Sequence, residues 1–353
     1  TNDGGSEGAL ILESKGRVSF ANLSSSLSIN GAAYTLLGSV QSLASAIAAN
    51  PGGNYALASD YDAKVDGTYS AAPISTYLTG TVQGLGNTIS NLRINDPTSG
   101  TNVGLFAKIQ GTVSDLILAN VRIRARRHMT AGGLAGVNIG NLVHDAVSGS
   151  VSAESSNVGG LVGANGELIS RSSSSASVSS SRKTGIVGGL VGFSQSNYTI
   201  DSSFATGSVT GGDHAIVGGL VGAFAAGTIT NSYATGAVSA GASALVGGFV
   251  GETDDRTIVG TSYSTGAVQA GSGSYIGGFV GQVFDSNFND CYWDITSSGT
   301  DQGIGQGNAS GITGLTTTQF QSELPAGFDR AIWNEQSKVN DGFPYLLTNP
   351  PSK

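Results

Sequence analysis

Cysteine and histidine, which supply disulfides and many catalytic or metal-binding sites, are scarce in this sequence of 353 residues: it has one cysteine and three histidines. The single cysteine, Cys291, excludes an intrachain disulfide, and neither a His-Glu-x-x-His motif nor a paired-cysteine ligand set is present. The net charge of −8 argues against general binding to nucleic acid or to an anionic membrane. No apolar run approaches the ~18–20 residues that cross a bilayer. We therefore expect no metal, no cofactor, no membrane span and no nucleic-acid partner.

Long amphipathic helices are also scarce. The 55 glycines and the many serines, threonines and valines favour short strands joined by tight turns. Hydrophobic residues still make up 39% of the chain, which excludes a disordered polar tract. The polar first residues, Thr1–Gly5, do not resemble a signal peptide, so the sequence is interpreted as a mature or internal segment.

An internal repeat dominates the chain. A Gly-Leu-Val-Gly-like tetrad recurs at intervals of 27 to 30 residues, beginning at Gly133, Gly160, Gly189, Gly219, Gly248 and Gly278. A second motif, Ser-aromatic-x-Thr-Gly-x-Val, keeps the same period and begins at Ser203, Ser232 and Ser262. Two motifs locked to one period predict a solenoid, because each unit is too short for a propeller blade and lacks a helix.

The predicted fold is all-β, a right-handed parallel β-helix with coils of about 29 residues and capped ends. Equivalent positions in such a rod stack in columns. One predicted core column contains Leu134, Leu161, Leu190, Leu220, Phe249 and Phe279. A second predicted core column, of stacked aromatic rings, contains Phe204, Tyr233, Tyr263 and Tyr292.

The whole chain, 1–353, is interpreted as one elongated domain. Residues 1–52 are expected to hold N-terminal coils and a short helix at Ser39–Asn50, which has an apolar stripe and a Pro-Gly stop. Residues 53–310 are expected to form the repeat coils. Residues 311–353, which are rich in aromatic side chains and contain a second short helical stretch at Thr316–Ser322, are expected to form a C-terminal cap on the last coil.

The repeat unit resembles a known family. Its sequence, VGGLVG at Val217–Gly222 followed by TITNSYATGAVSAG at Thr228–Gly241, is similar to the GLUG repeat of bacterial secreted proteins. Together with Ser28–Leu36, Gly84–Leu92 and Phe343–Leu346, it resembles the passenger region of filamentous-haemagglutinin-type adhesins exported by two-partner secretion. This resemblance implies a secreted or cell-surface β-helical stalk with a role in adhesion, aggregation or biofilm.

The most unusual segment is the basic run Val121–His128. Period-two alternation predicts that Arg122, Arg124 and Arg126 point outward, where guanidinium groups can bind anionic glycans through carboxylate or sulfate. The alternative is a charged face that keeps the rod soluble. Whether Arg93 lies beside Arg122 depends on the register. A 24-residue shift, which aligns the similar runs at 88–92 and 112–116, is favoured here and does not pair the two arginines.

Carboxylates gather in the last coils at Asp254, Asp255, Asp285, Asp290 and Asp294. A converging pair would bind Ca²⁺ or act in acid–base catalysis, but solvated loops are the favoured interpretation. The histidines, His128, His144 and His214, are interpreted as surface residues, and Cys291 as a small core residue at the repeat's serine position. The short threonine row Thr206, Thr235 and Thr265 is a weak indication of surface or ice binding.

The sequence therefore predicts a secreted or surface-attached bacterial adhesin or structural stalk, without enzymatic activity. Its expected partners are surface glycans of host or bacterial cells, and self-association is a further expectation. The alternative function is that of a polysaccharide lyase or glycoside hydrolase on the same scaffold, which would need a groove with converging acids.

Overall fold

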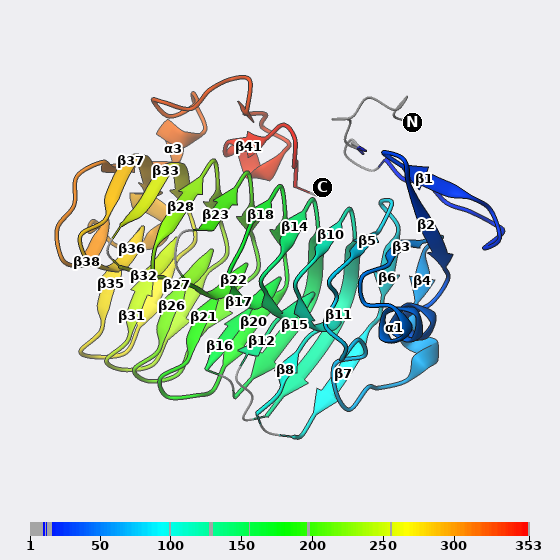
Figure 1. The fold of residues 1–353 in the computed structure, drawn as a ribbon. Coiled ribbons are helices and arrows are strands. Elements are labelled where there is room, and N and C mark those ends of the chain that lie inside the picture. Colours follow the sequence, from blue (N-terminus) through cyan, green and yellow to red (C-terminus); the bar gives the residue numbers. More distant parts are fainter. Residues whose placement is uncertain are drawn as a thin grey trace.

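The chain forms a rod of stacked parallel coils, as the computed structural model shows (Figure 1). The structure describes residues 10, 12, 16–98, 100–126, 130–154, 156–195, 198–254 and 256–351. The predicted positions Thr1–Gly5, Arg127, His128 and Asp255 lie outside these ranges. The all-β fold and the stacking of parallel coils about 29 residues apart confirm the predicted fold class.

The largest sheet of the described chain contains 24 strands, which stack in three rows. The first row consists of β2 (Ala32–Leu37), β3 (Asn54–Leu57), β5 (Thr81–Gln83), β10 (Thr112–Ser114), β14 (Asn141–Val143), β18 (Ile169–Ser170), β23 (Tyr198–Asp201), β28 (Gly227–Thr230), β33 (Thr257–Ser264) and β37 (Asn287–Asp294), with β1 (Leu27–Ile29) antiparallel to β2. The second row consists of β4 (Tyr61–Asp62), β6 (Thr88–Ser90), β11 (Ile117–Ala125), β15 (Ala146–Ala153), β19 (Ser173–Ser174), β24 (Phe204–Ala205), β29 (Tyr233–Ala234), the later parts of β33 and β37, and β39 (Ile312–Leu315).

The third row continues around the next corner. It consists of β7 (Arg93–Asp96), the later parts of β11 and β15, β20 (Ser177–Ser180), β25 (Val209–Thr210), β30 (Val238–Ala240) and β34 (Val268–Ala270). The corner between the second and third rows falls inside β11, where Asn120 has a positive φ of 55°.

Two smaller sheets close each coil. One consists of β8 (Asn102–Val103), β12 (Thr130–Ala131), β16 (Asn157–Gly159), β21 (Ile186–Gly188), β26 (Ile216–Gly218), β31 (Leu245–Gly247) and β35 (Tyr275–Gly277). The other consists of β9 (Phe106–Ile109), β13 (Ala135–Asn138), β17 (Val162–Asn165), β22 (Val191–Ser194), β27 (Val221–Phe224), β32 (Val250–Thr253), β36 (Val280–Val283) and β38 (Ile304–Gln306).

The glycine that directly precedes each tetrad lies at the sharp turn between these two smaller sheets. A Cβ atom added to Gly188 would lie 1.9 Å from the carbonyl oxygen of Val191, and one added to Gly218 would lie 1.9 Å from that of Val221. Because backbone atoms cannot yield as a flexible side chain does, the close approach requires glycine at these positions.

The column that starts at Leu134 fills the interior of the rod, as predicted. Its members are 0–1% exposed, and consecutive members are linked by backbone hydrogen bonds such as Leu190 N–H to the Leu220 carbonyl. At the C-terminal end the column becomes aromatic, and the rings of Phe249 and Phe279 stack with centroids 4.7 Å apart. This column is part of the main hydrophobic cluster of the rod.

The second predicted column also stacks, but it lies on the outside of the coils. The rings of Phe204 and Tyr233 are 4.7 Å apart and nearly parallel, and those of Tyr233 and Tyr263 are 5.1 Å apart. These rings form a hydrophobic cluster separate from the main core. The residues that follow them in sequence, such as Ala205 and Ala234, belong to the main core instead. A cover from elsewhere in the chain is therefore needed to bury these rings.

The C-terminal segment supplies that cover. After β39 and α3 (Thr317–Phe320) the chain turns back along the side of the rod, through β40 (Trp333–Asn334), the 3₁₀ turn η2 (Asn340–Gly342) and β41 (Tyr345–Leu346) (Figure 1). Trp333 packs against both Tyr233 and Tyr263, with ring centroids 6.1 and 5.9 Å apart. The segment from Thr316 to Pro351, called the tail below, thus contacts the last coil and also reaches back over earlier coils.

The opposite end of the rod is closed by the predicted helix. α1 (Val40–Ala49) begins after the N-cap Ser39 and ends at Asn50, and it buries Val40, Leu43 and Ile47 in the main core cluster (Figure 1). A 3₁₀ turn, η1 (Ala63–Asp66), and a short helix, α2 (Ile295–Ser298), lie at connections between strands.

The favoured register around Arg93 is wrong. Thr88–Ser90 pairs with Ile117–Ala119, a shift of 29 residues, and Arg93 lies directly beside Arg122. The similar run at Thr112–Ser114 pairs instead with β5, in the first row. The two runs look alike because both are short strands next to a corner, yet they occupy different sides of the coil.

Candidate functional site

Four arginines share one exposed face of the rod, on β7, β11 and the residue that follows β11. Arg122 and Arg124 alternate with the buried Val121 and Ile123, as the sequence predicts, and Arg126 is exposed as well. Arg93 pairs with Arg122 across adjacent coils, about 4.8 Å away along the rod. We call Arg93, Arg122, Arg124 and Arg126 the arginine face.

The next coil does little to neutralise this charge. Arg122 pairs with Ser150 and Arg124 with Ser152, while Glu154 follows Ala153 and so lies level with Arg126. Within the described residues the ion pairs are Arg17–Asp60 and His144–Asp115, and neither involves the arginine face. Adjacent like charges destabilise a sheet, so Arg93 and Arg122 favour an anion between them.

Two of the carboxylates in the last coils, Asp285 and Asp294, lie apart, near opposite ends of β37. Asp294 is fully buried and accepts hydrogen bonds from the backbone of Thr296 and Ser297 as the N-cap of α2. Asp285 is exposed in the connection before β37, whereas Asp294 is the last residue of that strand. Among the described residues, no three His, Cys, Asp or Glu side chains are grouped so as to hold a metal ion.

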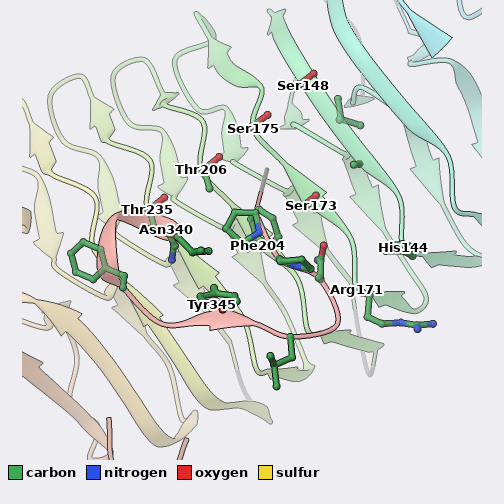
Figure 2. A pocket seen from close by; sticks show the side chains of 18 of the residues that line it. His144, Ser148, Arg171, Ser173, Ser175, Phe204, Thr206, Thr235, Asn340 and Tyr345 are labelled. Atoms are coloured by element: carbon green, nitrogen blue, oxygen red, sulfur yellow. The ribbon is translucent and has the colours of Figure 1, made fainter. Parts of the chain in front are cut away.

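The tail and the second row of strands enclose a long groove of about 1220 Å³ (Figure 2). Phe204 and Tyr345 lie in its lining, and Asn340 comes from the tail. Along one rim, one hydroxyl from each coil follows the corner between the second and third rows. These residues are Ser148, Ser175, Thr206, Thr235 and Thr265. Four of them are visible as a row in Figure 2.

The other rim carries the charged groups. His144 and Arg171 occupy the same corner of consecutive coils, and both have positive φ values, 60° and 49°. The His144 Nδ1 atom lies 2.7 Å from the Asp115 carboxylate of the preceding coil. His144 is half-buried, which differs from the predicted surface position, whereas His214 is exposed. Arg171 and His144 also line a neighbouring cavity of about 590 Å³.

A ladder of buried polar side chains runs behind this rim, inside the coils. The hydroxyl oxygens of Ser172, Ser203, Ser232 and Ser262 each accept a backbone N–H from the preceding coil, at 3.1–3.3 Å. Cys291 continues this column as a fully buried residue, and burial raises the pKa of its thiol to about 12. This placement confirms Cys291 as a core residue and disfavours a nucleophilic role.

Asp145 occupies the same column one coil before Ser172. Its Oδ1 accepts the backbone N–H of Leu116 at 3.0 Å, while its Oδ2 is buried without a partner in the described structure. Burial is the main cause that raises the pKa of Asp145 well above the usual range, and the nearby Asp115 adds to it. The carboxyl group is therefore protonated over a wider pH range than an exposed aspartate.

The groove was not predicted, although the sequence holds a partial signal for it. Phe204 and Thr206 flank the inward Ala205, so alternation indicates that both side chains face outward. What the repeat cannot indicate is where the non-repetitive tail lies. The threonines Thr206, Thr235 and Thr265 form part of one rim of this groove, and Asp294 follows Thr265 in register.

Comparison with known proteins supports the fold and the repeat. The GLUG motif model matches residues 213–239. No curated protein sequence matches the chain. A crystal structure from Bacteroides ovatus, of a putative immunoglobulin A1 protease, is similar with a TM-score of 0.57 and 16% sequence identity, covering 89% of this chain and 92% of that one. At this identity the likeness shows the fold alone. No helix among the described residues has the length and apolar character needed to cross a membrane.

Proposed function

We propose that this protein is a secreted or cell-surface adhesive rod of bacterial origin that binds anionic glycans through its arginine face. The observation that carries the proposal is the pairing of Arg93 with Arg122 on adjacent coils, without a carboxylate partner in the described structure. A guanidinium group offers a planar fork of donors that matches carboxylate or sulfate, and two of them in register match two such groups on one polymer. The GLUG motif at 213–239 supports a surface or secreted setting, as in the resemblance to filamentous-haemagglutinin-type passengers.

The proposal is tested with a glycan array that includes sulfated, uronate-containing and neutral glycans. The double variant Arg93→Ala, Arg122→Ala is compared with Arg182→Ala, Lys183→Ala, which removes the same charge from an exposed loop. We expect the first variant to lose on the order of a hundredfold in affinity for anionic glycans, since hydrogen bonds to charged groups contribute ~1.5–3 kcal/mol each. The control should lose little.

Two outcomes count against the adhesive function of this face. An equal loss in both variants would mean that only the net charge matters. The absence of binding by the parent protein would favour a stalk without a ligand. Removal of Arg126 should matter less than removal of Arg122, because Glu154 lies level with Arg126 on the next coil.

A carbohydrate-active enzyme is the second candidate, and the His144–Asp115 pair beside the groove favours it. A histidine oriented by a carboxylate is a common general base. Incubation with uronate polysaccharides, followed by assay of new reducing ends, separates the two functions. Product formation that His144→Ala abolishes would establish the enzyme, whereas intact polymer supports a purely adhesive protein.

A further inference from the structure

We propose that the groove beneath the tail is a second binding site, which holds an oligosaccharide chain lengthwise with a carboxylate-bearing sugar beside Arg171. The groove is separate from the arginine face, because the corner at Asn120 lies between them. It therefore gives the rod a second way to hold a glycan, through shape and neutral hydrogen bonds rather than through clustered charge.

The walls of the groove are fixed before any ligand arrives. The Tyr263 hydroxyl donates to the Pro344 carbonyl oxygen and accepts a hydrogen bond from the Asn340 side-chain amide at 2.7 Å. Farther along, the Asn349 amide donates to the carbonyl oxygens of Ser172 and Ser202, at 3.4 and 3.1 Å. Such anchoring reduces the entropy lost on binding.

The hydroxyl rim has a spacing that selects a class of ligand. Coils stack about 4.8 Å apart, so the rim from Ser148 to Thr265 offers one hydroxyl per coil over about 19 Å. The side-chain hydroxyls of Ser175, Thr206 and Thr235 make no hydrogen bond within the described residues, and each can both donate and accept. A polymer with several hydroxyls on every repeating unit satisfies such a row.

Other extended polymers fit less well. Side chains on one face of an extended peptide repeat every ~6.6 Å, which does not match the coil spacing. A nucleic acid would bring a dense line of phosphates to a protein whose net charge is −8. A sugar chain has a repeat close to the coil spacing, and the hydroxyls on each of its units can pair with the hydroxyls of the rim.

The cationic end of the groove sets the charge of the ligand. The Arg171 guanidinium makes no hydrogen bond or ion pair within the described residues, and it borders both cavities. The neighbouring His144 is already paired with Asp115. The Arg171 guanidinium is therefore the group at this end whose N–H donors can bind a ligand. Bidentate binding of a carboxylate is the geometry that a guanidinium satisfies best.

The test is calorimetric titration of the purified chain with oligogalacturonates from dimer to hexamer, and with the carboxyl-reduced oligosaccharides of the same lengths. We expect affinity to rise with length up to about the pentamer and then to level off. The double variant Thr206→Val, Thr235→Val, which keeps the branched shape, should lose about tenfold, or 1.4 kcal/mol, with both series. Arg171→Asn should lose about tenfold with the acidic series only.

Matched controls make the result specific. Thr210→Val removes an outward threonine from the third row, and Arg256→Asn removes an exposed arginine that also has a positive φ, 66°. Both should bind like the parent. The proposal is overturned if affinity does not depend on length, or if the controls lose as much as the groove variants. It is also overturned if Arg93→Ala, Arg122→Ala abolishes all binding while the groove variants change nothing, an outcome that leaves the arginine face supported.

Discussion

The two stacked columns of this rod share one period but differ in what buries them. The Leu134–Phe279 column is buried by the coils themselves, in the main core cluster. The Phe204–Tyr263 column is equally inaccessible, at 0–5% exposure, yet it lies outside the coils and is covered by the tail. Burial in a repeat protein therefore has two sources, one that every repeat contains and one that a single non-repetitive segment provides.

This difference separates two energetic units. The inner column should stabilise the rod cooperatively, since each residue packs against its equivalents in both neighbouring coils. The outer column should mainly stabilise the docking of the tail, because its contacts are shared with Trp333, Phe320 and Phe328. Substitutions that separate rod stability from tail docking test this distinction.

The largest effect is expected for Leu220→Ala, in the inner column. Leu220 is fully buried between its equivalents Leu190 and Phe249. Its truncation should lower the free energy of unfolding by ~2–5 kcal/mol through lost burial and a residual cavity. Urea unfolding followed by circular dichroism measures the change, with the outward Ser239→Ala as the control. A loss below about 0.5 kcal/mol would contradict the cooperative inner column.

A smaller effect, of opposite sign, is expected at the inward Asp145. Replacement by serine, the residue that the next coils carry there, should stabilise the rod by ~1–3 kcal/mol at neutral pH by removing a buried carboxyl oxygen without a partner. Because the folded pKa is raised, the parent protein has its full stability below the unfolded pKa, about 3.9, and loses stability as pH rises through the folded pKa.

The advantage of Asp145→Ser should therefore shrink near pH 4. Urea titrations at both pH values give the difference. Ser172→Ala is the paired control, which should destabilise the rod because the Asp145 backbone N–H then loses its acceptor. A serine variant that is less stable than the parent at neutral pH would show that the carboxyl group is well accommodated.

The smallest effect is expected for Tyr263→Phe, in the outer column. The change keeps the ring stack but removes the hydroxyl that joins the Pro344 carbonyl and the Asn340 amide, a loss of ~0.5–1.5 kcal/mol. Hydrogen exchange should show faster opening of residues 338–351, while exchange in β27 and β32 stays unchanged. Equal acceleration in both regions would mean that tail and rod form one cooperative unit.

The repeat made much of the fold predictable. Coil length, the inner column, α1 and the outward direction of Arg122 and Arg124 follow from period and alternation, which are local properties of the chain. Prediction failed where the repeat fades. Before Gly133 the motifs are degenerate, so the likeness of 88–92 to 112–116 outweighed the 29-residue period and misplaced Arg93.

The site was less predictable than the fold, for a physical reason. Phe204 and Tyr233 were expected in the core because apolar residues at a regular spacing usually mark it. Their outward direction is visible in the alternation with Ala205, but their cover comes from the tail, and Trp333 lies 100 positions after Tyr233 in the chain. No local pattern encodes such a contact, and the groove exists only because of it.

The anchoring of Asn349 has a consequence for repeat-number variation. Recombination between similar repeats adds or removes whole coils, and the rod itself tolerates this because every junction is alike. The tail does not, since Asn349 reaches carbonyl groups 177 and 147 residues earlier in the chain. Loss of one coil between β24 and β37 would place an earlier coil beneath Asn349 and remove its contact with Ser202. The tail therefore restricts copy number on the C-terminal side of Ser172, while the coils before it are free to vary.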